Sequence, residues 1–157
     1  MAGAGTRALP LQSLLDRFID PYEPMTSPEA ARRRLDEAVR RDLEWMLNSR
    51  RDPTEVPPHF TQVRRSVFQW GLPDMTGFST SSKPDRIRLQ RLLQDTIAAL
   101  EPRLRDVRVT VAESSDRGNS LRFTIAAVLV APPCVERVAF NSVVDLGTGN
   151  CRVEGNG

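Results

Sequence analysis

The acidic residues of this sequence support a catalytic hypothesis better than any other residue type. Glycoside hydrolysis needs two carboxyl groups on either side of a sugar, one of them with a raised pKa. Glu44, Asp74 and Glu101 could supply such a pair. Because a chain with 20 acidic residues always contains some such pair, this pattern has almost no specificity for a lysozyme-like peptidoglycan hydrolase.

Other catalytic chemistry has even less support. His59 is the single histidine and lies in a proline-rich stretch, with no nucleophile signature nearby. One histidine and the two cysteines do not fall into the spacing of metal ligands, and no glycine-rich loop of the phosphate-binding type is present. The sequence therefore predicts a protein that is not an enzyme and has no catalytic residue, metal site, cofactor or small-molecule substrate.

Glu101 is an acidic residue at the C-terminal end of a predicted helix, where a negative charge is unfavourable. Ser82, as N-cap, and Pro84 in the first turn predict the start of a helix whose leucine-rich face recurs every three or four residues up to Leu100. Pro102 stops this helix. A carboxylate at the end of a helix faces the negative end of the helix dipole, so Glu101 marks a candidate functional site. The alternative is a solvated ion pair with Arg103 or Arg105 that contributes little.

Composition predicts a single soluble, cytosolic domain. The length of 157 residues suits one domain with a hydrophobic core, and a net charge of +2 with interleaved acidic and basic residues argues against nucleic-acid binding. No signal peptide is evident, and the longest apolar run, Ile125–Ala131, is far shorter than the ~20 residues of a membrane helix. Cys134 and Cys151 are expected to be reduced, structural thiols.

The order of the elements predicts an α+β fold. Ser27 and Pro28 begin a helix that extends to about Ser49, and the Ser82 helix follows after a proline-rich loop and a short apolar segment, Ser66–Trp70. Residues then alternate with a period of two. Strands are expected at 107–111, 121–129, 135–146 and 151–153. We expect the N-terminal helices to pack on one face of a largely antiparallel C-terminal sheet.

The first 26 residues are expected to form a flexible tail, followed by a single domain over residues 27–157. Within the tail, Leu11–Ile19 could form a short helix with an apolar side that includes Leu15 and Phe18. So short a helix is marginal in water unless it docks. Its docking site could be the domain's own core or a partner protein.

Four segments carry distinctive motifs: LLDRF at 14–18, VRRDLEWMLNSRR at 39–51, SVFQWGLPDMTG at 66–77 and EPRL at 101–104. In this order they resemble the TssE family, the baseplate subunits of type VI secretion, which are similar to a small wedge protein of contractile phage tails. The resemblance spans about residues 14–153. It departs from the family pattern at Trp70, where a tyrosine is expected.

The resemblance implies a structural role, although the phage relatives carry a lysozyme-like label. The chain would be a cytoplasmic subunit assembled at the inner face of the cell envelope, and it would contact other wedge proteins (TssF, TssG and TssK) through Glu101, Pro102 and Arg103. It would also help to initiate assembly of the contractile sheath. Regulatory anti-adaptors share this fold, so a response regulator is an alternative partner.

The end of the predicted sheet offers a second contact. The last two strands should leave an unpaired edge unless one of them inserts centrally. Such an edge can accept a strand from another protein, and the family resemblance implies sheath subunits as that protein. The predicted pairing residues are Val143, Val144, Asp145, Cys151 and Val153. An edge covered only by the C-terminal residues and solvent is the alternative.

Overall fold

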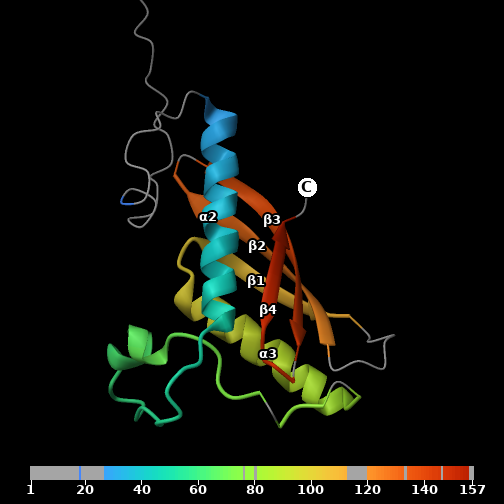
Figure 1. The fold of residues 1–157 in the computed structure, drawn as a ribbon. Helices are drawn as coiled ribbons and strands as arrows, with labels where there is room; N and C mark the ends of the chain where they lie inside the picture. Colours follow the sequence, from blue (N-terminus) through green and yellow to red (C-terminus); the bar gives the residue numbers. More distant parts are fainter. Residues whose placement is uncertain are drawn as a thin grey trace, which may run out of the picture.

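A computed structural model describes residue 18 and residues 27–155, apart from residues 76, 80, 113–119, 133 and 146. Two α-helices precede a four-stranded sheet (Figure 1), which confirms the α+β fold class. The elements are α2 (Pro28–Asn48), the 3₁₀ helices η1 (Val63–Arg65) and η2 (Val67–Gln69), α3 (Lys83–Leu100), and the strands β1 (Leu104–Val111), β2 (Ser120–Ala131), β3 (Cys134–Asp145) and β4 (Cys151–Gly155).

Both long helices begin at the serine that the sequence indicates. The Ser27 hydroxyl accepts a hydrogen bond from the Ala30 N–H at 3.1 Å, and the Ser82 hydroxyl accepts one from the Asp85 N–H at 3.3 Å. Each hydroxyl satisfies a main-chain donor that has no partner within its helix. The predicted tail residue Leu15 lies outside the described residues, whereas Phe18 is helical and 82% exposed.

The sheet is antiparallel throughout, with the strand order β1-β2-β3-β4. Alternate residues of β2 are buried and the residues between them are exposed or half-buried, so only one face of the sheet is covered. The same hydrophobic core contains side chains of both helices and of all four strands. Helices α2 and α3 therefore cover a single face of the sheet, as the sequence predicts.

A β-bulge in β1 keeps its apolar residues on the core side. The register with β2 shifts between Arg105 and Arg108, and Asp106 has a φ of 52°, a conformation seen in few residues other than glycine. The extra residue lets Leu104 and Val107, three positions apart, both lie buried. Strict alternation would have turned one of them to solvent.

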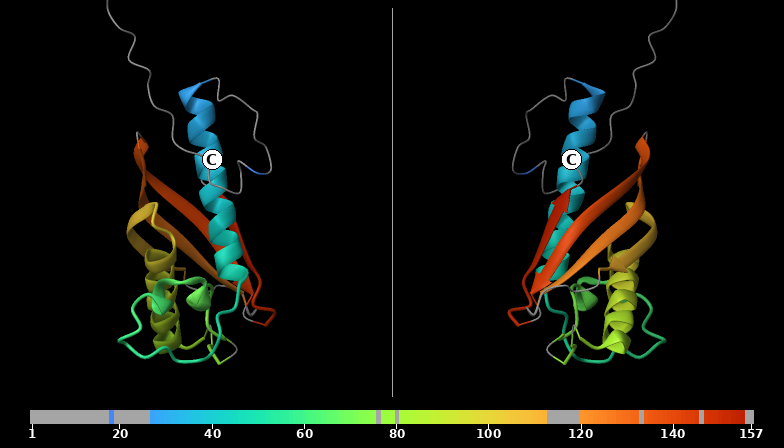
Figure 2. Two further views of the ribbon diagram at one scale, coloured as in Figure 1. Left: turned by 90° about the vertical axis from the view of Figure 1, so that its left-hand side faces the viewer. Right: turned by 90° about the vertical axis from the view of Figure 1, so that its right-hand side faces the viewer.

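Helix α2 lies along the edge strand β4 (Figure 2), and its side chains form hydrogen bonds with main-chain groups of that strand. Asn48 donates to the Cys151 carbonyl and accepts from the Cys151 N–H, both at 2.7 Å. Glu44 accepts from the Val153 N–H at 3.1 Å, and Arg40 donates to the Val153 carbonyl at 3.2 Å. All four of these main-chain groups of Cys151 and Val153 therefore have side-chain partners, a set of contacts that we call the α2–β4 ladder.

The spacing of the ladder follows from helix and strand geometry. Arg40, Glu44 and Asn48 are four residues apart, which is a rise of about 6 Å along an α-helix. Alternate residues of a strand, such as Cys151 and Val153, point their main-chain N–H and C=O groups to the same side and are about 6.6–6.8 Å apart. Because the two repeats nearly match, one row of helical side chains can reach consecutive main-chain groups of β4.

Candidate functional site

The junction between α3 and β1 carries the motif singled out in the sequence. The Glu101 N–H donates to the Ile97 carbonyl at 2.9 Å, and the Leu104 N–H donates to the Glu101 carbonyl at 3.1 Å. Glu101 is the C-cap, with φ −111° and ψ 88°, a non-helical conformation that agrees with the steric effect of Pro102 on the preceding residue. The turn that results brings residues 101 and 103 to the same side of the chain.

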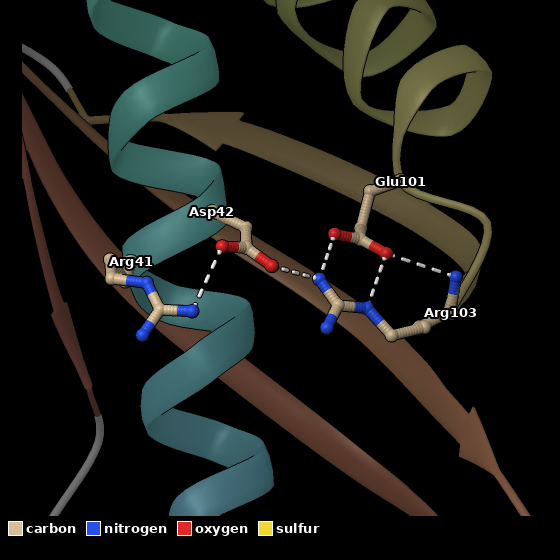
Figure 3. A network of polar contacts seen from close by, with 4 residues as sticks. All are labelled: Arg41, Asp42, Glu101 and Arg103. Atoms are coloured by element: carbon tan, nitrogen blue, oxygen red, sulfur yellow. Dashed lines mark hydrogen bonds and ion pairs between the residues drawn. The ribbon is translucent and has the colours of Figure 1, made fainter. Parts of the chain in front are cut away.

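Glu101 and Arg103 form a bidentate ion pair at this turn (Figure 3). Arg103 Nε lies 2.7 Å from Glu101 Oε1, and Arg103 Nη2 lies 2.5 Å from Glu101 Oε2. The Arg103 main-chain N–H also donates to Oε1, at 3.1 Å. The positive guanidinium offsets the unfavourable position of Glu101 at the end of α3.

A residue of α2 completes this network. Arg103 Nη2 donates to Asp42 Oδ2 at 2.6 Å, although the two residues are 61 positions apart. Arg41 Nη2 lies 3.3 Å from the other oxygen of Asp42. The hydrogen bond with Glu101 and, to a smaller extent, the contacts with Asp42 raise the pKa of Arg103 above its usual range, against the opposing effect of burial. We call Asp42, Glu101 and Arg103 the EPR network.

The pair of Glu101 and Arg103 is largely buried. Glu101 is only 5% exposed, and the Arg103 side chain is 24% exposed. Arg105, the other predicted partner, is exposed and makes no ion pair with any residue that the structure describes. The network therefore braces the fold by linking α2 to the start of β1, and the role of its residues in partner binding stays a prediction.

A groove of about 400 Å³ opens beside the EPR network. Trp45 forms part of its wall and is 48% exposed, with the Arg41 guanidinium carbon 5.1 Å from its ring centroid. The full lining consists of Asp42, Trp45, Trp70, Leu100, Glu101, Pro102 and Arg103. We call it the tryptophan groove. It combines aromatic side chains with a charged pair held in a fixed position.

Trp70 reaches the groove because the loop after α2 returns to the end of that helix. The Leu72 N–H donates to the Ser49 carbonyl at 2.9 Å, and the Arg51 N–H donates to the Leu72 carbonyl at 3.0 Å. Gly71 has a φ of 100°, and a Cβ on it would lie 2.5 Å from the Ser49 carbonyl oxygen. Only glycine fits this close approach without strain.

Sequence reasoning singled out Glu101, Pro102 and Arg103 but missed the other four lining residues of the groove, among them Asp42 and Trp45. Asp42 was part of a charge-rich motif, but nothing in its spacing indicated a partner at position 103. Trp45 lies beside the apolar stripe of α2, which suggested a cover for the edge of the core more than a contact for another protein. An exposed tryptophan next to a buried stripe was the available signal.

The three candidate carboxylates of a hydrolase do not line a common cavity in the described part of the chain. Glu44 accepts a hydrogen bond from Val153 in the ladder, and both oxygens of Glu101 are occupied by Arg103. Asp74 lies in a different hollow, beside the proline-rich loop. Glu44 and Asp74 are absent from the lining of the groove that contains Glu101. Glu44, Asp74 and Glu101 therefore do not form a pair of carboxylates around this groove.

Other chemistry is equally sparse. The ring of His59 packs against Phe60, with the two centroids 4.2 Å apart. Within the described ranges, no group of three histidine, cysteine or acidic side chains could hold a metal ion. In the same ranges, no helix is long and apolar enough to span a bilayer. Cys134 and Cys151 are both free thiols.

The residues predicted to form a pairing edge occupy two different environments. Val143, Val144 and Asp145 belong to β3, which pairs with β2 on one side and β4 on the other. Their assignment to an open edge is therefore wrong, because β4 covers β3. Cys151 and Val153 do lie on the edge strand, but the ladder already occupies their outward-facing groups. A strand from a partner could pair there only after displacing α2.

Comparison with known proteins gives one match. A family model described as baseplate wedge protein gp25 matches residues 33–133. The matched range contains every residue of the EPR network and of the tryptophan groove. Neither the curated proteins nor the solved structures contain a significant match to the chain.

Proposed function

The chain belongs to the baseplate wedge protein gp25 family, and from this premise we propose that it is a non-enzymatic subunit of the type VI secretion baseplate wedge. In this role it binds TssF, TssG and TssK and helps to initiate assembly of the contractile sheath. It acts in the cytoplasm, at the inner face of the cell envelope. The family supports the structural role in a baseplate, and the motifs shared with TssE support the assignment to type VI secretion.

The observation that carries the proposal is the tryptophan groove beside the EPR network. Tryptophan and arginine are the residue types that most often dominate the energy of protein interfaces. Trp45 presents a half-exposed ring, while Glu101 and Asp42 already hold the Arg103 guanidinium in place. A partner that binds this groove therefore loses little conformational entropy in ordering it.

Burial of Glu101 decides which residue should be changed in a test. Removal of Glu101 or Arg103 breaks an internal brace as well as the surface of the groove, so its effect on binding could not be separated from its effect on folding. Trp45 forms part of the wall of the groove and makes no hydrogen bond with its side chain in the described part of the chain. Its truncation alters the groove and leaves the charged contacts of the network in place.

The test is co-purification of the tagged full-length chain with TssF, TssG and TssK from its own cell. Trp45→Ala should reduce their recovery at least tenfold, because a central aromatic contact is worth about 2 kcal/mol or more. Phe60→Ala is the matched control, since Phe60 is 50% exposed and lies outside the groove. This control should recover the partners as the wild type does.

Three outcomes would contradict the proposal. Equal losses of partner recovery in Trp45→Ala and Phe60→Ala would mean that the groove is not part of the contact with the wedge proteins. Recovery of a response regulator in place of wedge proteins would favour a regulatory anti-adaptor. Hydrolysis of peptidoglycan by the purified chain, abolished in Glu101→Gln at unchanged stability, would favour an enzyme.

A further inference from the structure

The sheet has a second face that neither helix covers. On β2, the side chains opposite to the buried ones are those of Arg122, Thr124, Ala126, Val128 and Val130, all exposed or half-buried. We call the surface formed by these residues and their cross-strand neighbours the open face. It lies on the opposite side of the sheet from α2 and α3.

Arginines dominate the charge of the open face. All four strands contribute, with Arg105 and Arg108 from β1, Arg122 from β2, Arg137 from β3 and Arg152 from β4. All five are exposed. Their guanidinium groups make no hydrogen bond or ion pair with any residue in the described part of the chain.

Acidic side chains balance this charge only in part. Asp106 is exposed in the bulge between Arg105 and Arg108, Asp145 lies at the end of β3, and Glu154 pairs with Asn141 of β3. The Asp145 carboxylate is occupied in the following turn, where it accepts from the main-chain N–H groups of residues 147 and 148. On the helix side, by contrast, Arg103 binds Asp42 at 2.6 Å, and Arg32 binds Glu136 at 2.8 Å. The open face thus carries five exposed arginines whose guanidinium groups have no acidic partner in the described part of the chain.

The strand register arranges the arginines in two rows. Arg105 and Arg137 flank Val128 on adjacent strands, so their Cα atoms are about 10 Å apart. Arg122 and Arg152 flank Val143 in the same way. The two rows are separated by six residues of β2, or about 20 Å.

Small and apolar side chains form the floor between the two rows. Ala126 and Ala139 pair across β2 and β3, and Arg108 is the neighbour of Ala126 on β1. Thr124 and Asn141 form the next pair and are joined by a side-chain hydrogen bond of 3.1 Å. Glu154 pairs with Asn141 at the β4 side of this row. The floor is therefore apolar at Ala126 and Ala139, has one carboxylate at its β4 side, and has arginines at both of its ends.

We propose that the open face binds an acidic segment of a partner protein. Its carboxylates pair with the arginine rows at the two ends, and its apolar middle covers the floor at Ala126 and Ala139. Arginine suits this role because its planar guanidinium binds a carboxylate with two parallel hydrogen bonds. The chain then has two contact surfaces on opposite sides of the sheet, the tryptophan groove and the open face, as a connecting subunit requires.

The composition of the surface favours protein over nucleic acid. Single-stranded nucleic acid is bound mainly by aromatic side chains that stack on the bases, and the phenylalanines of the sheet, Phe123 and Phe140, point into the core. A phosphate backbone would also leave the floor between the arginine rows uncovered. An acidic polypeptide supplies both the carboxylates and the apolar atoms that this arrangement accepts.

A titration with poly-L-glutamate, followed by the backbone amide signals of the isotope-labelled full chain, tests the surface. Shifts should concentrate on the exposed residues of the four strands. Arg122→Glu with Arg152→Glu should weaken binding at least fivefold. The matched control is Arg88→Glu with Arg91→Glu, which changes the net charge equally at two exposed positions of α3 and should weaken binding less than twofold.

The result is clear in either direction. Equal weakening by the two double variants, or shifts that spread over the helices, would show a non-specific charge effect and overturn the proposal. Tighter binding of a 20-base-pair DNA duplex than of poly-L-glutamate, at the same salt concentration, would also overturn it in favour of nucleic acid. If the reversed pair does not fold, Arg122→Gln with Arg152→Gln tests the same contacts, with a smaller expected loss of about twofold.

Photo-crosslinking identifies the segment in the cell. A benzophenone amino acid at Thr110, an exposed position of β1, should give a crosslinked partner peptide that mass spectrometry shows to be rich in aspartate and glutamate. The same amino acid at Ala98, exposed on α3, should not give that peptide. A neutral or basic peptide at Thr110, or the same product from both positions, would contradict the proposal. Neither outcome depends on the tryptophan groove, so this test can fail while the proposed wedge contact holds.

Discussion

Helix α2 is attached to the rest of the molecule along two sides, and the two attachments differ in kind. In the α2–β4 ladder, the side chains of Arg40, Glu44 and Asn48 bind main-chain groups of β4. In the EPR network, Asp42 binds the side chain of Arg103. The first attachment is directed at the backbone, and the second is directed at one particular residue.

This difference determines how each attachment responds to sequence change. Every strand residue except proline offers an N–H and a carbonyl group, so the ladder depends on the residues of α2 and hardly on those of β4. The EPR network requires the correct residue at three separate positions, and the loss of Arg103 removes the shared partner of both carboxylates. The ladder should therefore tolerate substitution on its strand side, whereas the network should not tolerate it anywhere.

The largest effect is expected from Arg103→Ala. It leaves the carboxylate of Glu101, only 5% exposed, without its ion pair, and breaking a buried pair in this way costs about 3 kcal/mol of unfolding free energy. Urea denaturation measures the loss. Arg105→Ala is the control, because Arg105 is exposed and should change the free energy by less than about 0.5 kcal/mol. Equal effects of the two substitutions would mean that the network contributes no stability.

Asn48→Ala should have the next largest effect. It removes both hydrogen bonds to Cys151, and the main-chain groups that lose their partners cost about 1–2 kcal/mol. Hydrogen exchange at the Cys151 amide should accelerate, which a general loss of helix stability would not single out. Asn150→Ala, in the turn before β4, provides the control. Unchanged exchange at Cys151 in Asn48→Ala would contradict the ladder.

The smallest effect concerns Cys151 at alkaline pH. Burial, with a smaller contribution from Glu44, raises the pKa of this thiol from 9.0 to about 12. Because the unfolded chain releases the proton first, the stabilisation is complete below pH 9 and is lost as the pH rises from about 9 to about 12. Between pH 7.5 and 9.5, the free energy of unfolding measured by urea denaturation should fall by about 1 kcal/mol more in the wild type than in Cys151→Ala. Parallel losses would mean that the thiol titrates normally.

Local patterns in the sequence predicted most of the fold. The serine caps, the leucine spacing of α3 and the alternation in β2 each depend on residues within one element, and the structure confirms them. The junction at Glu101 was also recognisable, because a carboxylate at a helix end conflicts with the helix dipole. Its pairing with Arg103, two residues away, was one of the alternatives that the sequence left open.

The partners of these elements could not be read from the sequence, because they depend on how distant segments pack. The contact between Asp42 and Arg103 crosses 61 positions, and the ladder joins Asn48 to Cys151 across 103. The sequence thus determined the helices, the strands and the position of the charged turn, since their signals are local. Only the tertiary structure decided that Glu101 is buried, that α2 covers the edge of β4, and that five arginines share the uncovered face, because strand register and helix placement bring those residues together.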